Sequence, residues 1–73
     1  MEQIKISYQL PSEGRVTEVT AEFLFLQGTA RTEKTAVQKM MKMAKSCLNA
    51  ANPDAVAGAQ AAIAAGKAWL KAN

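Results

Sequence analysis

The spacing of apolar residues changes once along this chain, and that change limits the fold more than any other feature does. Near the N-terminus apolar side chains recur at every second position, which is the period of a half-buried β-strand. From residue 32 onward they recur at every third or fourth position, which is the period of an amphipathic helix. Strands followed by helices predict an α+β fold built on an antiparallel sheet.

The alternating part of the chain predicts one β-hairpin over residues 3–26. Its two halves are separated by residues 11–14, where proline and glycine suit a turn. A four-residue loop would place Ile6 opposite Val19, and in this register apolar residues face mostly apolar ones while polar residues face polar ones. Two independent patterns therefore agree on the hairpin.

The predicted second strand is longer than the first, so its end has no partner. Residues 23–26 read Phe-Leu-Phe-Leu and are apolar on both faces, and an unpaired strand of this kind tends to pair with another chain. We therefore expect a homodimer or a stable complex with a larger protein. The strand residues that would form this interface are Leu24, Phe25 and Leu26. The alternative is a short helix over residues 20–27 that ends at Gly28.

A first helix is predicted over residues 32–50. Thr32 or Thr29 suits its N-cap, and Glu33 suits its first turn because the helix dipole favours a carboxylate there. One arc of this helix is apolar and the opposite arc is polar, so we expect it to bury one face. The residues of the apolar arc are Val37, Met40, Met41, Ala44, Cys47, Leu48 and Ala51.

A second helix is predicted over residues 53–71, where Asn52 suits the N-cap and Pro53 suits the first position. So few of its residues are polar that we expect it to be covered on more than one side. Gly58 and Gly66 each lower the stability of a helix, and they indicate close packing against a neighbour. Together the helices should cover one face of the hairpin, formed by Ile4, Ile6, Tyr8, Val19 and Phe23.

These elements make one small domain, residues 1–73, in ββαα order. A chain of this length buries only about 60% of its unfolded surface, so its core is small. The unpaired strand and the alanine-rich helix both favour a dimer, which would enlarge this core.

The positive charge of the chain is concentrated in one segment. The net charge is +3, and residues 31–49 alone carry +4, because five basic residues there stand against one glutamate. Such a local field attracts anionic partners. Base recognition and single-strand stacking favour arginine and aromatic side chains, so an ordinary solvated helix face is the alternative. The candidate binding face consists of Lys34, Lys39, Lys42 and Lys45.

Residue types that carry catalysis or bind metals are scarce. The chain has no histidine and one cysteine, which excludes a histidine-based triad, a Cys/His zinc site and a disulfide within one chain. We predict no enzymatic activity, no metal and no cofactor, and a buried structural thiol for Cys47. The N-terminus lacks the apolar run of a secretory signal, and the longest apolar run is far too short to span a membrane. One free cysteine and four methionines suit a reducing cytosol, so we expect a cytoplasmic protein without membrane insertion.

These observations favour a small non-catalytic interaction protein, a regulator or inhibitor that binds and occludes a larger protein. A regulator from a phage or mobile element is one form of this hypothesis. Trp69 is a candidate for the same interface, and a place in the core is the alternative for it. The second hypothesis is a nucleic-acid-binding accessory protein that uses the lysine face. A third is a structural subunit whose exposed strand pairs between copies.

Overall fold

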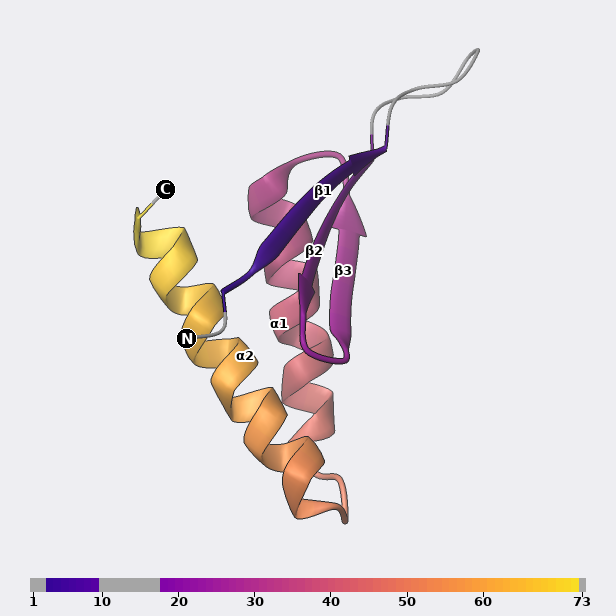
Figure 1. Cartoon of the computed structure of the whole chain (residues 1–73), viewed down its shortest axis with the longest axis vertical. Coiled ribbons are helices and arrows are strands. Elements are labelled where there is room, and N and C mark those ends of the chain that lie inside the picture. Colours follow the sequence, from indigo (N-terminus) through magenta and orange to yellow (C-terminus); the bar gives the residue numbers. More distant parts are fainter. Residues whose placement is uncertain (1–2, 10–17, 73) are drawn as a thin grey trace.

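The computed structural model describes residues 3–9 and 18–72, which form a three-stranded antiparallel sheet followed by two helices (Figure 1). The strand order in the sheet is β1-β2-β3. The elements are β1 (Lys5–Gln9), β2 (Glu18–Phe23), β3 (Leu26–Ala30), α1 (Glu33–Cys47) and α2 (Pro53–Ala72). The predicted α+β class and the order of strands before helices are confirmed, and the predicted number of strands is wrong.

The third strand replaces the long second strand that the sequence predicts. The chain reverses at Leu24 and Phe25, and Phe23 pairs with Leu26 across this two-residue turn. Neither the strand continuing to residue 26 nor the alternative helix over residues 20–27 is formed. The reversal supplies a partner within the chain for the end of β2, so the argument for a dimer from an unpaired strand no longer holds.

The register of β1 against β2 differs from the predicted one by two residues. Ile6 pairs with Ala21, and Tyr8 pairs with Val19. A shift of two positions keeps every side chain on the same face, so the apolar pattern alone could not distinguish the two registers. The observed register also places Lys5 opposite Glu22, an oppositely charged cross-strand pair. The predicted turn at residues 11–14 lies outside the described residues.

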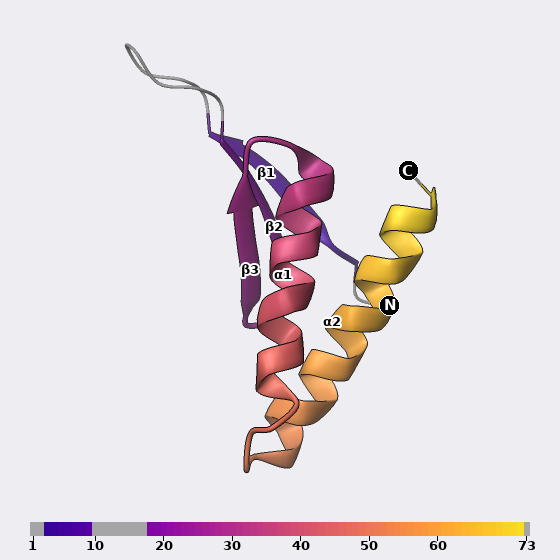
Figure 2. The same cartoon turned by 180° about the vertical axis from the view of Figure 1, so that it is seen from behind.

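Helix α1 lies against the inner face of β2 and β3, and α2 packs along another side of α1 (Figures 1 and 2). The helices therefore cover β2 and β3 more fully than β1. Ile4 and Ile6 are only half-buried, and Tyr8, which the sequence places in the covered face, is exposed. The buried core consists of Val19, Ala21, Phe23, Leu26, Ala36, Val37, Met40, Met41, Ala44, Ala59 and Ala62.

The C-terminal residues of the predicted apolar arc on the first helix are less buried than the rest, although Cys47 still packs against the core. Cys47 is half-buried, and Leu48 and Ala51 are exposed. Helix α1 ends at Cys47, three residues before the predicted end, so the later residues no longer follow the helical period. At its start Thr32 is the N-cap, and its hydroxyl accepts a hydrogen bond from the Thr35 amide at 3.2 Å.

Three glycines allow elements to approach closely. A Cβ added at Gly28 in β3 would lie 2.3 Å from the carbonyl oxygen of Ala36 and 2.4 Å from the amide nitrogen of Met40, so the α1 backbone rests directly on the strand. In α2, Gly58 meets the ring of Phe25 and Gly66 meets the side chain of Met41. The prediction that the helical glycines mark close packing is confirmed.

Candidate interaction surface

The four residues predicted to form a protein interface do not lie together. Leu24 and Phe25 form the β2–β3 turn and are 51% and 56% exposed. Leu26, only two positions later, is 2% exposed and belongs to the core, so its predicted role at an interface is wrong. Trp69 is half-buried and packs against the core cluster. The accessible part of the predicted interface is therefore the turn itself, which we call the hairpin tip (Leu24 and Phe25).

The hairpin tip has an unusual backbone for its residues. Leu24 has φ = 55°, in the left-handed region where glycine and asparagine are favoured and a bulky side chain is strained. The Phe25 ring lies against α2, because a Cβ added at Gly58 would be 2.7 Å from its Cε1 atom. The tip is thus anchored on the first turns of α2 while about half of each side chain stays in contact with solvent.

Large apolar side chains that are exposed in the described chain include Tyr8 in β1 and the two residues of the hairpin tip. Two further large ones are Met43 at 47% and Leu48 at 38%, both in the C-terminal part of α1 or directly after it. The backbone of α1 passes Gly28 at Ala36 and Met40, and the helix runs on from there toward the β2–β3 turn (Figure 1). The C-terminal part of α1, which carries Met43, therefore lies on the same half of the molecule as the tip. The half-molecule containing the β2–β3 turn therefore has most of the large apolar side chains that are exposed in the described chain.

The candidate lysine face is exposed along the whole of α1, but it divides into two parts. Lys34, Lys42 and Lys45 share about a quarter of the helix circumference at 3.6 residues per turn. Lys39 points to the flank of α1 that faces β3. Within residues 3–9 and 18–72, no carboxylate forms an ion pair with any of these lysines.

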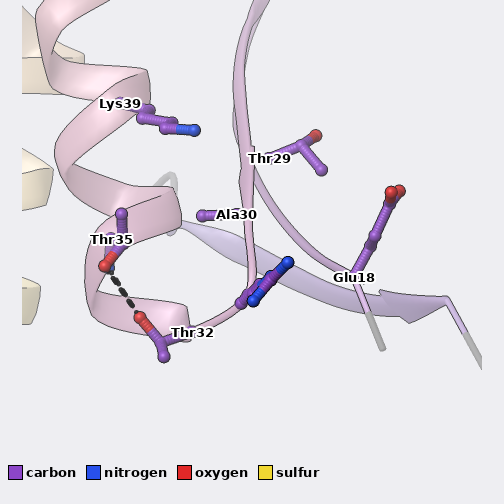
Figure 3. Close-up of a pocket in the computed structure, with 7 residues that line it drawn as sticks. Glu18, Thr29, Ala30, Thr32, Thr35 and Lys39 are labelled. Atoms are coloured by element: carbon purple, nitrogen blue, oxygen red, sulfur yellow. Dashed lines mark hydrogen bonds between the residues drawn. The ribbon is translucent and has the colours of Figure 1, made fainter. Parts of the chain in front are cut away.

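A pocket of about 480 Å³ lies between β3 and the N-terminal half of α1, and we call it the β3–α1 groove (Figure 3). Lys39 extends into it from α1, and the hydroxyl of Thr32 donates to that of Thr35 at 2.8 Å along its wall. The β3–α1 groove is lined by two basic side chains and one carboxylate. Its lining residues are Glu18, Thr29, Ala30, Arg31, Thr32, Thr35 and Lys39.

Sequence reasoning missed the β3–α1 groove, because it requires the third strand. One signal was available: Thr35 and Lys39 are spaced four apart on the predicted helix, which places two polar side chains in one row. Arg31 lies just before the helix and was counted only for its charge.

At the other edge of the sheet, the hydroxyl of Tyr8 donates a hydrogen bond to the carboxylate of Glu33. The contact joins β1 to the first turn of α1. This hydrogen bond is the main reason that the pKa of the Tyr8 phenol is raised above its ordinary value of 10.0, with desolvation and the negative charge of Glu33 acting in the same direction. The phenol proton is therefore held more tightly in the folded chain than in the unfolded one.

This contact predicts a titration that can be measured directly, because Tyr8 is the only tyrosine. We expect tyrosinate absorbance near 295 nm to appear with a midpoint above pH 10, and Glu33→Ala to bring the midpoint back toward 10. The contribution of the contact to stability should be complete below pH 10 and should be lost as the pH rises through the folded pKa. An identical midpoint in both proteins would show that the hydrogen bond does not form in solution.

The described residues contain no group of three or more histidine, cysteine, aspartate or glutamate side chains placed to hold a metal ion. In the same part of the chain, neither helix has both the length and the apolar character needed to cross a membrane. Comparison of the chain with protein-family models, with curated proteins and with solved structures gives no match.

Proposed function

We propose that this chain is a small non-catalytic protein-interaction module that binds a larger protein through the hairpin tip. The observation that carries the proposal is the identity of the two turn residues. A two-residue hairpin turn is normally built from glycine, asparagine or aspartate. Here it is built from Leu24 and Phe25, which leave about half of their side chains in water.

The stability of the fold does not account for leucine and phenylalanine at these two turn positions. A bulky residue held at positive φ costs roughly 1–2 kcal/mol, and a domain of 73 residues has only about 4–11 kcal/mol of stability in total. The exposed half of each side chain contributes nothing to the core. A partner with an apolar pocket would bury these side chains and recover the cost as binding energy.

The charge around the exposed apolar side chains indicates the kind of partner. Met43 and the exposed Lys39 are four positions apart on α1, so they are neighbours on one face of the helix. An apolar side chain beside a cation is complementary to an apolar pocket bordered by carboxylates. We therefore expect a partner with an acidic surface, and occlusion of that surface is how the chain would act as a regulator or inhibitor.

The proposal is tested with a variant that removes both side chains while keeping the turn. In Leu24→Asn/Phe25→Gly, asparagine tolerates the positive φ at position 24 and glycine tolerates the backbone of position 25, so the fold should be kept. Proteins retained by the immobilised chain from its source cells would be identified, purified and titrated against it by calorimetry. We expect the double variant to bind the partner at least roughly 30-fold more weakly, the effect of losing one strong anchor.

The matched control is Ala61→Ser, a change on the exposed side of α2, which should leave the affinity unchanged. Circular dichroism must show that the double variant is folded. If the folded double variant binds every retained protein as tightly as the native chain does, or if the native chain retains none, the proposal is wrong.

A second candidate function is binding to nucleic acid, and it is favoured by the exposure of all four candidate lysines without a carboxylate partner in the described chain. Free ammonium groups can neutralise phosphates and release counterions, which makes affinity fall steeply with salt. This binding would use the face of α1 and does not need the hairpin tip.

For this candidate we expect labelled duplex DNA to bind at low salt and to dissociate as salt is raised, measured by fluorescence anisotropy. The variant Lys39→Gln/Lys42→Gln/Lys45→Gln should abolish binding, or lower the salt slope by roughly 2–3 if each lysine contacts one phosphate. Lys67→Gln/Lys71→Gln, at the end of α2, is the control for a general loss of charge. Unchanged affinity in the triple variant would eliminate this function.

A further inference from the structure

We propose that the free edge of β3 and the adjoining flank of α1 bind an extended acidic segment of a partner protein, which adds to the sheet as a fourth strand. This inference rests on the proposed function, since it specifies how a protein partner is held. It concerns the β3–α1 groove and the edge of the strand, whereas the proposed function rests on the hairpin tip.

Within residues 3–9 and 18–72, strand β3 lies at one end of the sheet and pairs with β2 alone. In a hairpin with a two-residue turn, the pair that closes the turn is hydrogen-bonded and the bonding then alternates from pair to pair. Phe23 and Leu26 close this turn. The amide and carbonyl groups of Gln27 and Thr29 therefore point away from β2, and both residues are exposed.

Among the residues that the structure describes, this edge lacks the usual protection against strand addition. Proteins commonly protect an edge strand with lysine, proline, a bulge or a covering segment. The five residues of β3, Leu-Gln-Gly-Thr-Ala, include no charge and no proline. They pair in register with β2 without a bulge. The opposite edge strand, β1, begins with Lys5.

Helix α1 supplies the second wall of the proposed site. The contact of Gly28 with Ala36 and Met40 fixes the helix close to the strand. Thr35 and Lys39 on α1 then lie beside the C-terminal part of β3 (Figure 3), and together with Arg31, just before the helix, they line the β3–α1 groove. A strand edge flanked by a helix is the arrangement in which an extended peptide gains main-chain hydrogen bonds from the edge and side-chain contacts from the helix.

The charges of the groove specify the ligand. Arg31 and Lys39 line it against one carboxylate, that of Glu18, and within the described chain neither cation forms an ion pair with a carboxylate. Aspartate or glutamate side chains of a segment bound here would form charge-assisted hydrogen bonds with these two cations and strengthen its binding. Toward the other end of β3 the segment would reach the side of the hairpin tip, where an apolar side chain is favoured.

A second copy of this chain fits the edge less well. Two β3 strands paired antiparallel about a two-fold axis would place their central residues, Gly28, opposite each other. The backbone of Lys39 is level with Gly28, since its carbonyl carbon lies 3.0 Å from a Cβ added there. The two copies would therefore bring their Lys39 side chains together, which is unfavourable for like charges. An acidic partner segment avoids this repulsion.

The test begins with a phage library of random linear dodecapeptides selected on the immobilised chain. We expect the enriched peptides to contain aspartate or glutamate beside β-forming residues, and Lys39→Glu to shift the enrichment away from acidic residues. Enriched peptides would be synthesised, and their affinity for the native chain and its variants measured by calorimetry.

The decisive variant is Thr29→Pro, which removes an outward-facing amide without removing a bond to β2, the position at which an edge strand tolerates proline. Its matched control, Thr29→Val, keeps the amide and likewise loses the hydroxyl that lies 3.2 Å from that of Thr20. We expect Thr29→Pro to weaken binding at least about 10-fold relative to Thr29→Val. Peptides methylated at alternate amide nitrogens should lose binding to the native chain, and this measurement does not depend on the variant folding.

Equal binding of the peptides to Thr29→Pro and Thr29→Val, or of methylated and unmethylated peptides, overturns the proposal, as does a selection that enriches no peptide. A native dimer in sedimentation that Thr29→Pro dissociates also overturns it, because the edge is then occupied by a second copy. Loss of partner binding in Leu24→Asn/Phe25→Gly but not in Thr29→Pro rejects strand addition and leaves the proposed function intact.

Discussion

Replacing Gly28 with valine is expected to leave the chain unfolded at room temperature. A Cβ at this position would lie 2.3 Å from the carbonyl oxygen of Ala36 and 2.4 Å from the amide nitrogen of Met40. Both atoms belong to the backbone of a helix and cannot rotate away, so α1 would have to lift off the sheet. Gly28→Ala should already lower the free energy of unfolding by about 3 kcal/mol or more. The larger, branched side chain of valine should lower it by more than the roughly 4–11 kcal/mol that a domain of this size has.

The control for Gly28 is Gly58→Ala in α2. Its added Cβ would also be too close to a neighbour, at 2.7 Å, but that neighbour is the ring of the exposed Phe25, which can turn aside. Alanine also favours the helix by up to about 1 kcal/mol, so the net change should stay within about 1 kcal/mol. Urea denaturation followed by far-UV circular dichroism measures both variants. A Gly28→Ala protein as stable as Gly58→Ala would contradict the direct contact between β3 and α1.

Substitutions at two leucines that lie only two positions apart are expected to change the free energy of unfolding very differently. Leu26→Ala should lower the free energy of unfolding by about 2–5 kcal/mol, because Leu26 is among the largest fully enclosed side chains of the core. Leu24→Gly should leave stability unchanged or raise it by up to about 1 kcal/mol, because glycine adopts the positive φ of this position without strain. Both are read from urea denaturation with circular dichroism and the fluorescence of Trp69.

The comparison of these leucines tests the position of the turn itself. If the second strand ran on to residue 26, as the alternation in the sequence predicts, Leu24 and Leu26 would share one face and respond alike. A similar loss of stability in both variants would therefore contradict the two-residue turn.

The helices could be predicted from the sequence because two kinds of signal agree in each of them. Thr32 and Asn52 cap the helix starts, and the apolar period selects residues such as Val37 and Met40, which are buried. Helix ends are marked more weakly, and Cys47 ends α1 without a glycine or proline directly after it. For the first helix, the predicted end at residue 50 is therefore less accurate than the predicted start at residue 32.

The third strand could not be predicted, because the turn before it contains none of the residues that mark turns. Phe23 and Leu26 have opposite phase in a continuous strand, and they share the inner face only once the chain reverses between them. The β3–α1 groove depends on this reversal, so Arg31 and Lys39 could be identified as basic but not as neighbours. The sequence identifies Leu24 and Phe25 as candidate interface residues because it predicts them, with Leu26, at the unpaired end of a long strand, and this strand is not formed.

The way that elements follow one another has a consequence for the speed of folding. Strand β3 and α1 are separated by two residues and pack extensively on each other, and α1 does the same with α2. Contacts between segments close in the chain require little loop-closure entropy, which is the condition for rapid folding. We expect a folding nucleus made of β3 and α1, with β1 joining late because it packs extensively only on β2.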